Sequence, residues 1–280
     1  MRRMTSSRVT PAPPSRSRRP WRAVINGRTA VPGAATRRAA VDRCYHRAMP
    51  VTRQRRRTRR PPKWTASELI AMLDEQYGRA PQQRSGAPVT ELVLTLLSQH
   101  TSDHNSGRAM HRLLERFPTW DDVLAAPTAD VEEAIRPGGL APTKAPRLQA
   151  LLAEVKQREP DFDLDRLAEL PLEEAKGWLR SLPGVGPKTA ACVLLFALGR
   201  PALPVDTHVD RVARRLGLVA PKVSTEQAHR LLEQQLEPDE VYAFHVHLIQ
   251  HGRRTCHARG PQCERCVLVE RCPRVGLPKR

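Results

Sequence analysis

The chain has 280 residues, enough for one or two domains with a hydrophobic core, and a formal net charge of +18. Residues 1–63 hold 19 Lys or Arg against one acid, so residues 64–280 carry 28 basic and 28 acidic side chains. The basic character is therefore no guide to what the folded part binds. No run of about 18 apolar residues occurs, which excludes a membrane-spanning helix.

Residues 1–63 contain arginine runs, eight prolines and no sustained hydrophobic period, and we predict that they are disordered. Three interpretations stay open: a nucleic-acid-binding arm, a gene start placed too far upstream of a true first residue at Met49 or later, and a targeting segment. Arginine pairs are typical of an export signal, but no apolar segment follows them, which argues against export.

From residue 64 onward the sequence predicts short helices joined by Pro/Gly turns. Leu69, Met72, Leu73 and Tyr77 recur at helical spacing and indicate an amphipathic helix. A break at 79–88 precedes a Leu/Val-rich stretch, 90–103, that is typical of a buried helix. No strand pattern is convincing, so we predict an all-α fold. Further helices are expected around 111–117, 130–135, 144–156, 172–182, 190–198, 210–216, 225–236 and 241–252.

Four of the six cysteines crowd into 17 residues with the spacing C-x6-C-x2-C-x5-C: Cys256, Cys263, Cys266 and Cys272. Four thiolates in so short a segment can reach one centre, which indicates a metal or cluster site in a reducing compartment. Structural zinc sites usually pair two close cysteine units across a longer loop. A single compact run fits a cluster held by four thiolates at least as well. The spacing alone leaves zinc and iron–sulfur open.

The stretch LPGVGPKTA, residues 182–190, predicts a tight turn that opens the next helix. Backbone N–H groups around Gly184 and Gly186 can point outward, where they could bind a phosphate oxygen; a plain interhelical turn is the alternative. Lys188 falls near the second position of that helix. The positive end of a helix dipole disfavours an ammonium there, which would favour a nucleophilic amine; an ordinary surface lysine is the alternative.

Asp206, in the stretch VDTHVD, precedes another predicted helix. An aspartate at this position is most often a helix N-cap. It could equally be a carboxylate that stabilises a cationic sugar and handles protons. The local sequence leaves both readings open.

Taken together, LPGVGPKTA, VDTH, HLIQHGRRTC and the four cysteines resemble the endonuclease III family of DNA glycosylases, in the helix–hairpin–helix base-excision superfamily, in order and approximate spacing over 64–272. The resemblance implies two α-helical domains with a DNA cleft between them. One is a six-helix barrel with the helix–hairpin–helix motif, here 82–199. The other, 64–81 plus 200–275, carries a 4Fe–4S cluster on the four cysteines.

The resemblance also implies roles for single residues. Lys188 matches the catalytic lysine that attacks C1′ of the damaged nucleotide and forms a Schiff base, and Asp206 matches the aspartate that supports this chemistry. The matching DNA contacts are the hairpin residues Gly184, Val185 and Gly186, the gap-filling and wedge residues His100 and Leu140, and Arg259 in the cysteine loop.

The implied activity is that of a bifunctional DNA glycosylase and AP lyase. It would act as a monomer on double-stranded DNA with damaged bases or abasic sites, in a bacterial cytoplasm on the nucleoid. Oxidised pyrimidines are the implied substrates, although the chain reads LSQHTSD at 97–103 where the best-known members read LSAQATD, and GLAPTKA at 139–145 where they read GLYNSKA. Both segments border the flipped base and the opposite strand.

Two alternatives stay open: the first is a related enzyme, and the second belongs to a different functional class. A monofunctional relative that removes mispaired adenine or thymine/uracil would also carry the cluster, but such relatives usually lack the lysine. A non-catalytic, cluster-bearing DNA-binding or redox-sensing protein would require neither Lys188 nor Asp206. The presence of both residues favours the bifunctional enzyme.

Overall fold

The computed structural model describes residues 64–278, which belong to one unit of the chain. Every regular element in this range is helical, which confirms the all-α prediction. No helix in this range is long and apolar enough to cross a membrane. The predicted disorder of residues 1–63 lies outside the described residues. The α-helices are α1 (Ala66–Tyr77), α2 (Pro88–Leu97), α3 (Asp103–Arg116), α4 (Trp120–Ala125), α5 (Thr128–Ile135), α6 (Ala141–Arg158), α7 (Leu172–Arg180), α8 (Pro187–Cys192), α9 (Thr207–Arg215), α10 (Thr225–Glu233) and α11 (Glu240–Arg254).

Three helices differ from the sequence prediction. Helix α2 ends at Leu97, whereas the predicted helix continued to residue 103, because His100 adopts a left-handed φ of 55° that a right-handed helix cannot contain. The prediction missed α4, although Thr119 and Asp122 form a reciprocal capping box that fixes its first turn. Helix α3 begins at Asp103, well before the predicted residue 111, because the Ser102 hydroxyl accepts the Asn105 N–H and caps it. Polar side chains at both starts hid the helices from a search for apolar periodicity.

The buried hydrophobic side chains form two groups. The first core is formed by side chains of the helices from α2 to α8, with Val89 and Ala202 as its first and last residues in sequence. The second core joins Trp64 and α1 to α9, α10 and α11, and includes Leu268. Segments far apart in sequence therefore share one core, which requires that the chain return on itself.

A π-helix, Val193–Ala197, continues α8 and touches both cores. Val193 and Leu194 belong to the first core, whereas Leu195 belongs to the second. The helical segment that starts at Pro187 therefore ends where the two cores meet.

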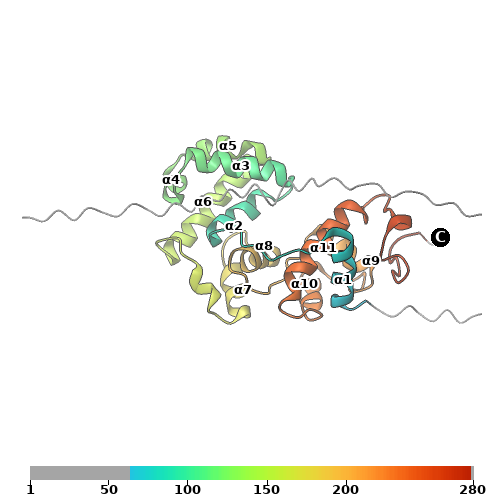
Figure 1. The fold of residues 1–280 in the computed structure, drawn as a ribbon. Coiled ribbons are helices and arrows are strands. Elements are labelled where there is room, and N and C mark those ends of the chain that lie inside the picture. Colours follow the sequence, from blue (N-terminus) through green and yellow to red (C-terminus); the bar gives the residue numbers. More distant parts are fainter. Residues whose placement is uncertain (1–63, 279–280) are drawn as a thin grey trace, which may run out of the picture. The chain divides into compact units, whose positions relative to one another are not determined.

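Helix α1 packs along α11, near the other end of the described chain (Figure 1). The Asp74 carboxylate accepts a hydrogen bond from His247 Nε2 at 2.7 Å, and His247 is fully buried. Tyr77 Oη lies 3.0 Å from both His251 Nδ1 and Thr255 Oγ1. These polar contacts fix the register of α1 on α11 in addition to the apolar packing.

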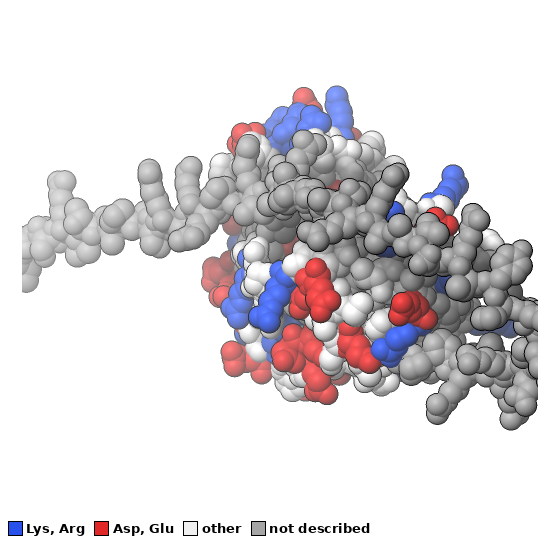
Figure 2. All heavy atoms as spheres, turned by 45° about the vertical axis from the view of Figure 1, so that its right-hand side comes forward, with Lys and Arg blue, Asp and Glu red and all other residues white. Residues whose placement is uncertain are grey.

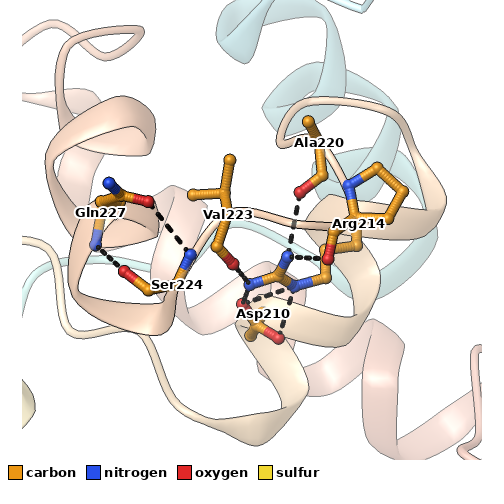
Figure 3. A network of polar contacts seen from close by, with 7 residues as sticks. Asp210, Arg214, Ala220, Val223, Ser224 and Gln227 are labelled. Atoms are coloured by element: carbon orange, nitrogen blue, oxygen red, sulfur yellow. Dashed lines mark hydrogen bonds and ion pairs between the residues drawn. The ribbon is translucent and has the colours of Figure 1, made fainter.

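Arg214 holds the loop that precedes α10 (Figure 3). Its Nε donates to both carboxylate oxygens of Asp210, at 2.9 and 2.8 Å. Its other nitrogens donate to the carbonyl oxygens of Ala220, Pro221 and Val223 at 2.8 to 3.0 Å. Loop carbonyls that no helix could satisfy thus find a charged donor.

Acidic and basic side chains are interspersed on the face drawn in Figure 2. This agrees with the balance of 28 basic and 28 acidic side chains in residues 64–280. Where described residues are visible in this view, they form no large field of one sign.

We predict that acid destabilises the protein through His245. This side chain is buried, and burial lowers its pKa from 6.5 to about 4. Below pH 6.5 the unfolded chain therefore binds a proton that the folded chain does not, so stability falls as the pH drops from 6.5 toward 4. The loss at pH 5 should be about 2 kcal/mol.

Urea unfolding at pH 7.5 and pH 5.0 measures this effect. His245→Gln should lose stability at both pH values but show a smaller difference between them. The same change at exposed His111 should leave the difference unaltered. An unchanged pH dependence in His245→Gln would contradict the assignment.

Candidate functional site

The turn between α7 and α8 is built as the glycines predict. Gly184 has a φ of +76°, a conformation that favours glycine, whereas Gly186 has a φ of −90°. Val185 is buried in the first core, and its N–H donates to the Leu182 carbonyl at 3.2 Å. Within 64–278 the N–H groups of Gly184 and Gly186 have no hydrogen-bond acceptor. Val185 thus anchors the turn while both glycine N–H groups stay available to a ligand.

Lys188 is the second residue of α8 and is half-buried. In the described part of the chain its amine has neither a hydrogen bond nor an ion pair. It lines a pocket of about 450 Å³ together with the glycine turn, the end of α2, the end of α7 and the start of α10. The other residues that line this pocket are Thr95, Gln99, Arg180, Gly184, Gly186, Pro187, Thr189, Thr225, Glu226 and His229.

A buried carboxyl group, Glu91, lies on α2 near Lys188. It accepts hydrogen bonds from Ser85 Oγ at 2.6 Å and from Thr95 Oγ1 at 3.3 Å. Burial raises the pKa of Glu91, and these hydrogen bonds and the positive charge of Lys188 act in the opposite direction. Glu91 could not be identified from the sequence, since a glutamate within an apolar helix does not by itself indicate a site.

Asp206 is the N-cap of α9. Its Oδ1 accepts the N–H groups of His208 at 2.8 Å and Val209 at 2.7 Å. The capping role left open above is therefore present. The second oxygen, Oδ2, accepts no hydrogen bond from any residue in 64–278, so the cap leaves one oxygen for other chemistry.

Lys188 and Asp206 act on the same two buried groups. Burial raises the pKa of the Cys192 thiol to about 12, an effect that Lys188 opposes and Asp206 reinforces. The pKa of His245, lowered mainly by burial, is raised by Asp206 and lowered further by Lys188. Lys188 and Asp206 therefore each lie near enough to Cys192 and His245 to act on their pKa values, although 17 residues separate them in sequence. Asp206 does not line the pocket of Lys188.

His100 and Leu140 share an unusual backbone conformation. Both are left-handed, with φ values of 55° and 52°, although neither is glycine. Both side chains are exposed, and Leu140 is one of three large apolar side chains so exposed among the described residues. Arg259 is exposed in the cysteine loop. These positions are accessible to a large ligand such as a nucleic acid.

The four cysteines predicted to bind one centre line a single cavity: Cys256, Cys263, Cys266 and Cys272. All four are free of disulfide bonds. Burial, and to a smaller extent the nearby cysteines, raise the pKa of Cys266 to about 11. Among the described residues no three His, Cys, Asp or Glu side chains are arranged to hold a single metal ion. The four thiols nevertheless line one space, where bound cations would favour their thiolate forms.

Two basic side chains from other helices contact these thiols. Arg215, on α9, donates from Nη1 to Cys256 Sγ at 3.2 Å and to the His257 carbonyl at 2.6 Å. His251 Nε2, on α11, lies 3.6 Å from Cys266 Sγ. The two contacts span 41 and 15 residues of sequence, and no local pattern marks Arg215 or His251 as a partner of the cysteines.

The HhH-GPD superfamily, described as base excision DNA repair proteins, matches residues 93–238. Over 190 residues the chain is 41% identical to a candidate DNA glycosylase of Arabidopsis thaliana, in a match that covers 66% of this chain and 64% of that protein. This chain thus spans slightly less than two thirds of the length of that relative.

Endonuclease III of Thermotoga maritima is 34% identical over 210 residues, which cover 73% of this chain and 91% of that protein. The solved structure of a trapped covalent intermediate of endonuclease III with DNA superimposes with a TM-score of 0.65 at 29% identity, covering 75% of this chain and 97% of that one. On the family match and these relatives, the chain belongs to the HhH-GPD superfamily of base excision DNA repair proteins and is a homologue of endonuclease III.

Proposed function

We propose that this protein is a bifunctional DNA glycosylase and AP lyase that excises damaged bases, oxidised pyrimidines among them, from double-stranded DNA. The observation that carries the proposal is the amine of Lys188. It is half-buried, it has no partner in the described part of the chain, and it opens into a pocket beside the glycine turn. An amine that serves only solubility has no reason to lie there.

The chemistry assigned to Lys188 is covalent catalysis. Its neutral amine attacks C1′ of the damaged nucleotide, the bond between C1′ and the base breaks, and the base leaves with the bonding electron pair. The nitrogen then loses a proton and the sugar ring opens to a Schiff base. Loss of a proton from C2′ expels the 3′ phosphate by β-elimination. A solved complex in which endonuclease III is trapped covalently on DNA supports this route.

Asp206 is proposed to stabilise the positive charge that develops on the sugar. Its Oδ1 is held by two N–H groups of α9, which fixes the carboxylate, and its Oδ2 is available. A negative charge held in place near C1′ lowers the barrier without reorganisation during the reaction. The same carboxylate can carry protons between steps.

The DNA contacts follow from the exposed positions. The N–H groups of Gly184 and Gly186 can hold a phosphate of any sequence, because such contacts carry no base information. His100 and Leu140 would fill the space left by an extruded nucleotide, and Arg259 would approach the backbone. Extrusion costs least for damaged or mispaired bases, which contributes to selectivity.

A 4Fe–4S cluster is proposed for the cavity lined by the four cysteines. Four free thiols around one space match the ligand set of such a cluster. When bound, it would supply cross-linking of the 256–272 segment rather than a reaction step. Arg215 and His251 contact the cysteine sulfurs and would orient them.

The two cores support the proposed division into a barrel domain, 82–199, and a cluster domain, 64–81 plus 200–275. Helix α8, which carries Lys188, belongs to the first part, and α9, which Asp206 caps, belongs to the second. A DNA cleft between the two parts would place the nucleophile and the carboxylate on opposite walls.

We predict that Lys188→Gln abolishes covalent trapping on abasic duplex DNA. Borohydride reduces the Schiff base to a stable adduct, which gel electrophoresis resolves. Loss of the nucleophile should lower the trapping rate by at least about 10³-fold. Exposed Lys222, changed to Gln, is the matched control and should trap like the wild type. Base excision by the wild type without any adduct would instead indicate a monofunctional glycosylase.

The substitution Asp206→Asn should separate the helix-capping role of this residue from the role of its negative charge. The amide oxygen of asparagine can still accept the two N–H groups, so the free energy of unfolding should change by less than about 1 kcal/mol. Single-turnover excision of a damaged base should slow by about 10²-fold, because the negative charge is lost. Asp206→Ala should lose both functions. Equal excision rates in Asp206→Asn and the wild type would refute the electrostatic role.

Metal analysis tests the cluster. Protein purified without added metal should contain about four iron atoms per chain with matching sulfide. Cys266→Ser should lower the iron content, whereas Cys192→Ser should not, since Cys192 lies in the first domain near Lys188. One zinc atom per chain and no iron would show that the site is a zinc site.

A further inference from the structure

The ammonium of Lys144, on α6, is buried and makes two hydrogen bonds to backbone carbonyls. It donates to the Leu97 carbonyl at 2.7 Å and to the Gly138 carbonyl at 2.9 Å. Only 4% of the residue is exposed, and burial lowers its pKa. No carboxylate of the described residues lies within ion-pair distance of it. A buried cation with only neutral partners is costly, so its presence calls for an explanation beyond stability.

The two carbonyls belong to the segments that carry the exposed left-handed residues. Leu97 ends α2, three residues before His100, and Gly138 ends the 3₁₀ helix Arg136–Gly138, two residues before Leu140. Carbonyls in the last turn of a helix lack intrahelical partners and carry partial negative charge. One ammonium therefore caps two helix ends at once and ties them together.

Lys144 also holds Leu140 through its own backbone. Its N–H donates to the Leu140 carbonyl at 2.9 Å, so Leu140 is the residue from which α6 starts. The packing behind the two segments is close: a Cβ on Gly138 would lie 3.1 Å from Ala109 Cβ and 3.8 Å from the Leu97 carbonyl oxygen. Because one amine binds both carbonyls, a shift of either segment would change the geometry of the hydrogen bond to the other segment.

We propose that Lys144 is a positioning residue that fixes the His100 and Leu140 segments relative to each other. Both side chains can then enter the DNA duplex at the same extruded nucleotide. This inference rests on the proposed function, because it assigns the two exposed side chains to the gap left by an extruded nucleotide. Lys144 itself touches neither the DNA nor the reacting atoms. It sets the spacing of the residues that do.

The test compares duplex and single-stranded DNA that carry the same abasic site. Single-stranded DNA has no stack to open, so trapping on it reports the chemistry of Lys188 alone. In Lys144→Met, borohydride trapping on the single strand should stay within about twofold of the wild type, and trapping on the duplex should fall by about tenfold or more. The fluorescence rise of 2-aminopurine beside the abasic site, which reports extrusion in the duplex, should shrink in parallel.

Lys156→Met is the matched control. Lys156 lies on the same helix but is more exposed, and its amine pairs with Asp121 at 3.1 Å. This variant should behave like the wild type on both substrates. If Lys144→Met does not fold, Lys144→Gln takes its place, since the shorter amide can still donate to one carbonyl.

A double-mutant cycle with Leu140→Ala adds a second readout. If Lys144 acts through Leu140, then Leu140→Ala should cost less duplex activity in the Lys144→Met background than in the wild type. Equal losses on duplex and single strand in Lys144→Met, or strict additivity in the cycle, would overturn the proposal. If the wild type traps on neither substrate, the lyase chemistry fails, and the 2-aminopurine signal alone still decides the role of Lys144.

Discussion

Carbonyl oxygens outside helical hydrogen bonds are the polar groups on which this all-helical fold depends, and cationic side chains satisfy many of them. A chain of short helices exposes carbonyls at every helix end and in every loop. Arg200 donates to three carbonyls between α6 and α7, from Leu167, Ala168 and Leu170. Arg214 and Arg215 do the same for the loops before α10 and after α11. Each arginine donates hydrogen bonds to carbonyl oxygens that a neighbouring strand would satisfy in a β-sheet.

This use of cations separates structural charges from the candidate catalytic one. The guanidinium groups of Arg200, Arg214 and Arg215 are occupied by carbonyls, several of them part-buried, which would lose a charged donor if the side chain moved. Lys188 differs, because its amine has no partner in the described residues. Asp206 is divided in the same sense: one oxygen is bound to backbone and the other is available. The Lys188 amine and Asp206 Oδ2 are thus available, while the charged groups around them are held by hydrogen bonds. Preorganised catalysis requires such an arrangement.

Apolar periodicity, turn residues and the spacing of the cysteines were sufficient to predict the helical class, the glycine turn, the start of α8 and the cysteine cavity, because each depends on local sequence. The contacts of Arg215 and Glu91 could not be predicted, since their partners lie far along the chain or depend on packing. Lys144 left a readable signal. It falls on the buried face of α6 among Ala141, Ala145 and Leu148. A lysine in line with such neighbours is a candidate for burial.

The pairing of α1 with α11 constrains how the chain folds during synthesis. Tyr77 meets His251, 174 residues further on, so α1 leaves the ribosome long before its partner exists. The apolar face of α1 must stay exposed or covered by a chaperone until α11 is made, whereas the first core can close earlier. The superfamily match, 93–238, contains none of α1 or α11. A fragment cut to those bounds would leave the second core open, so the family match does not define a unit that folds alone.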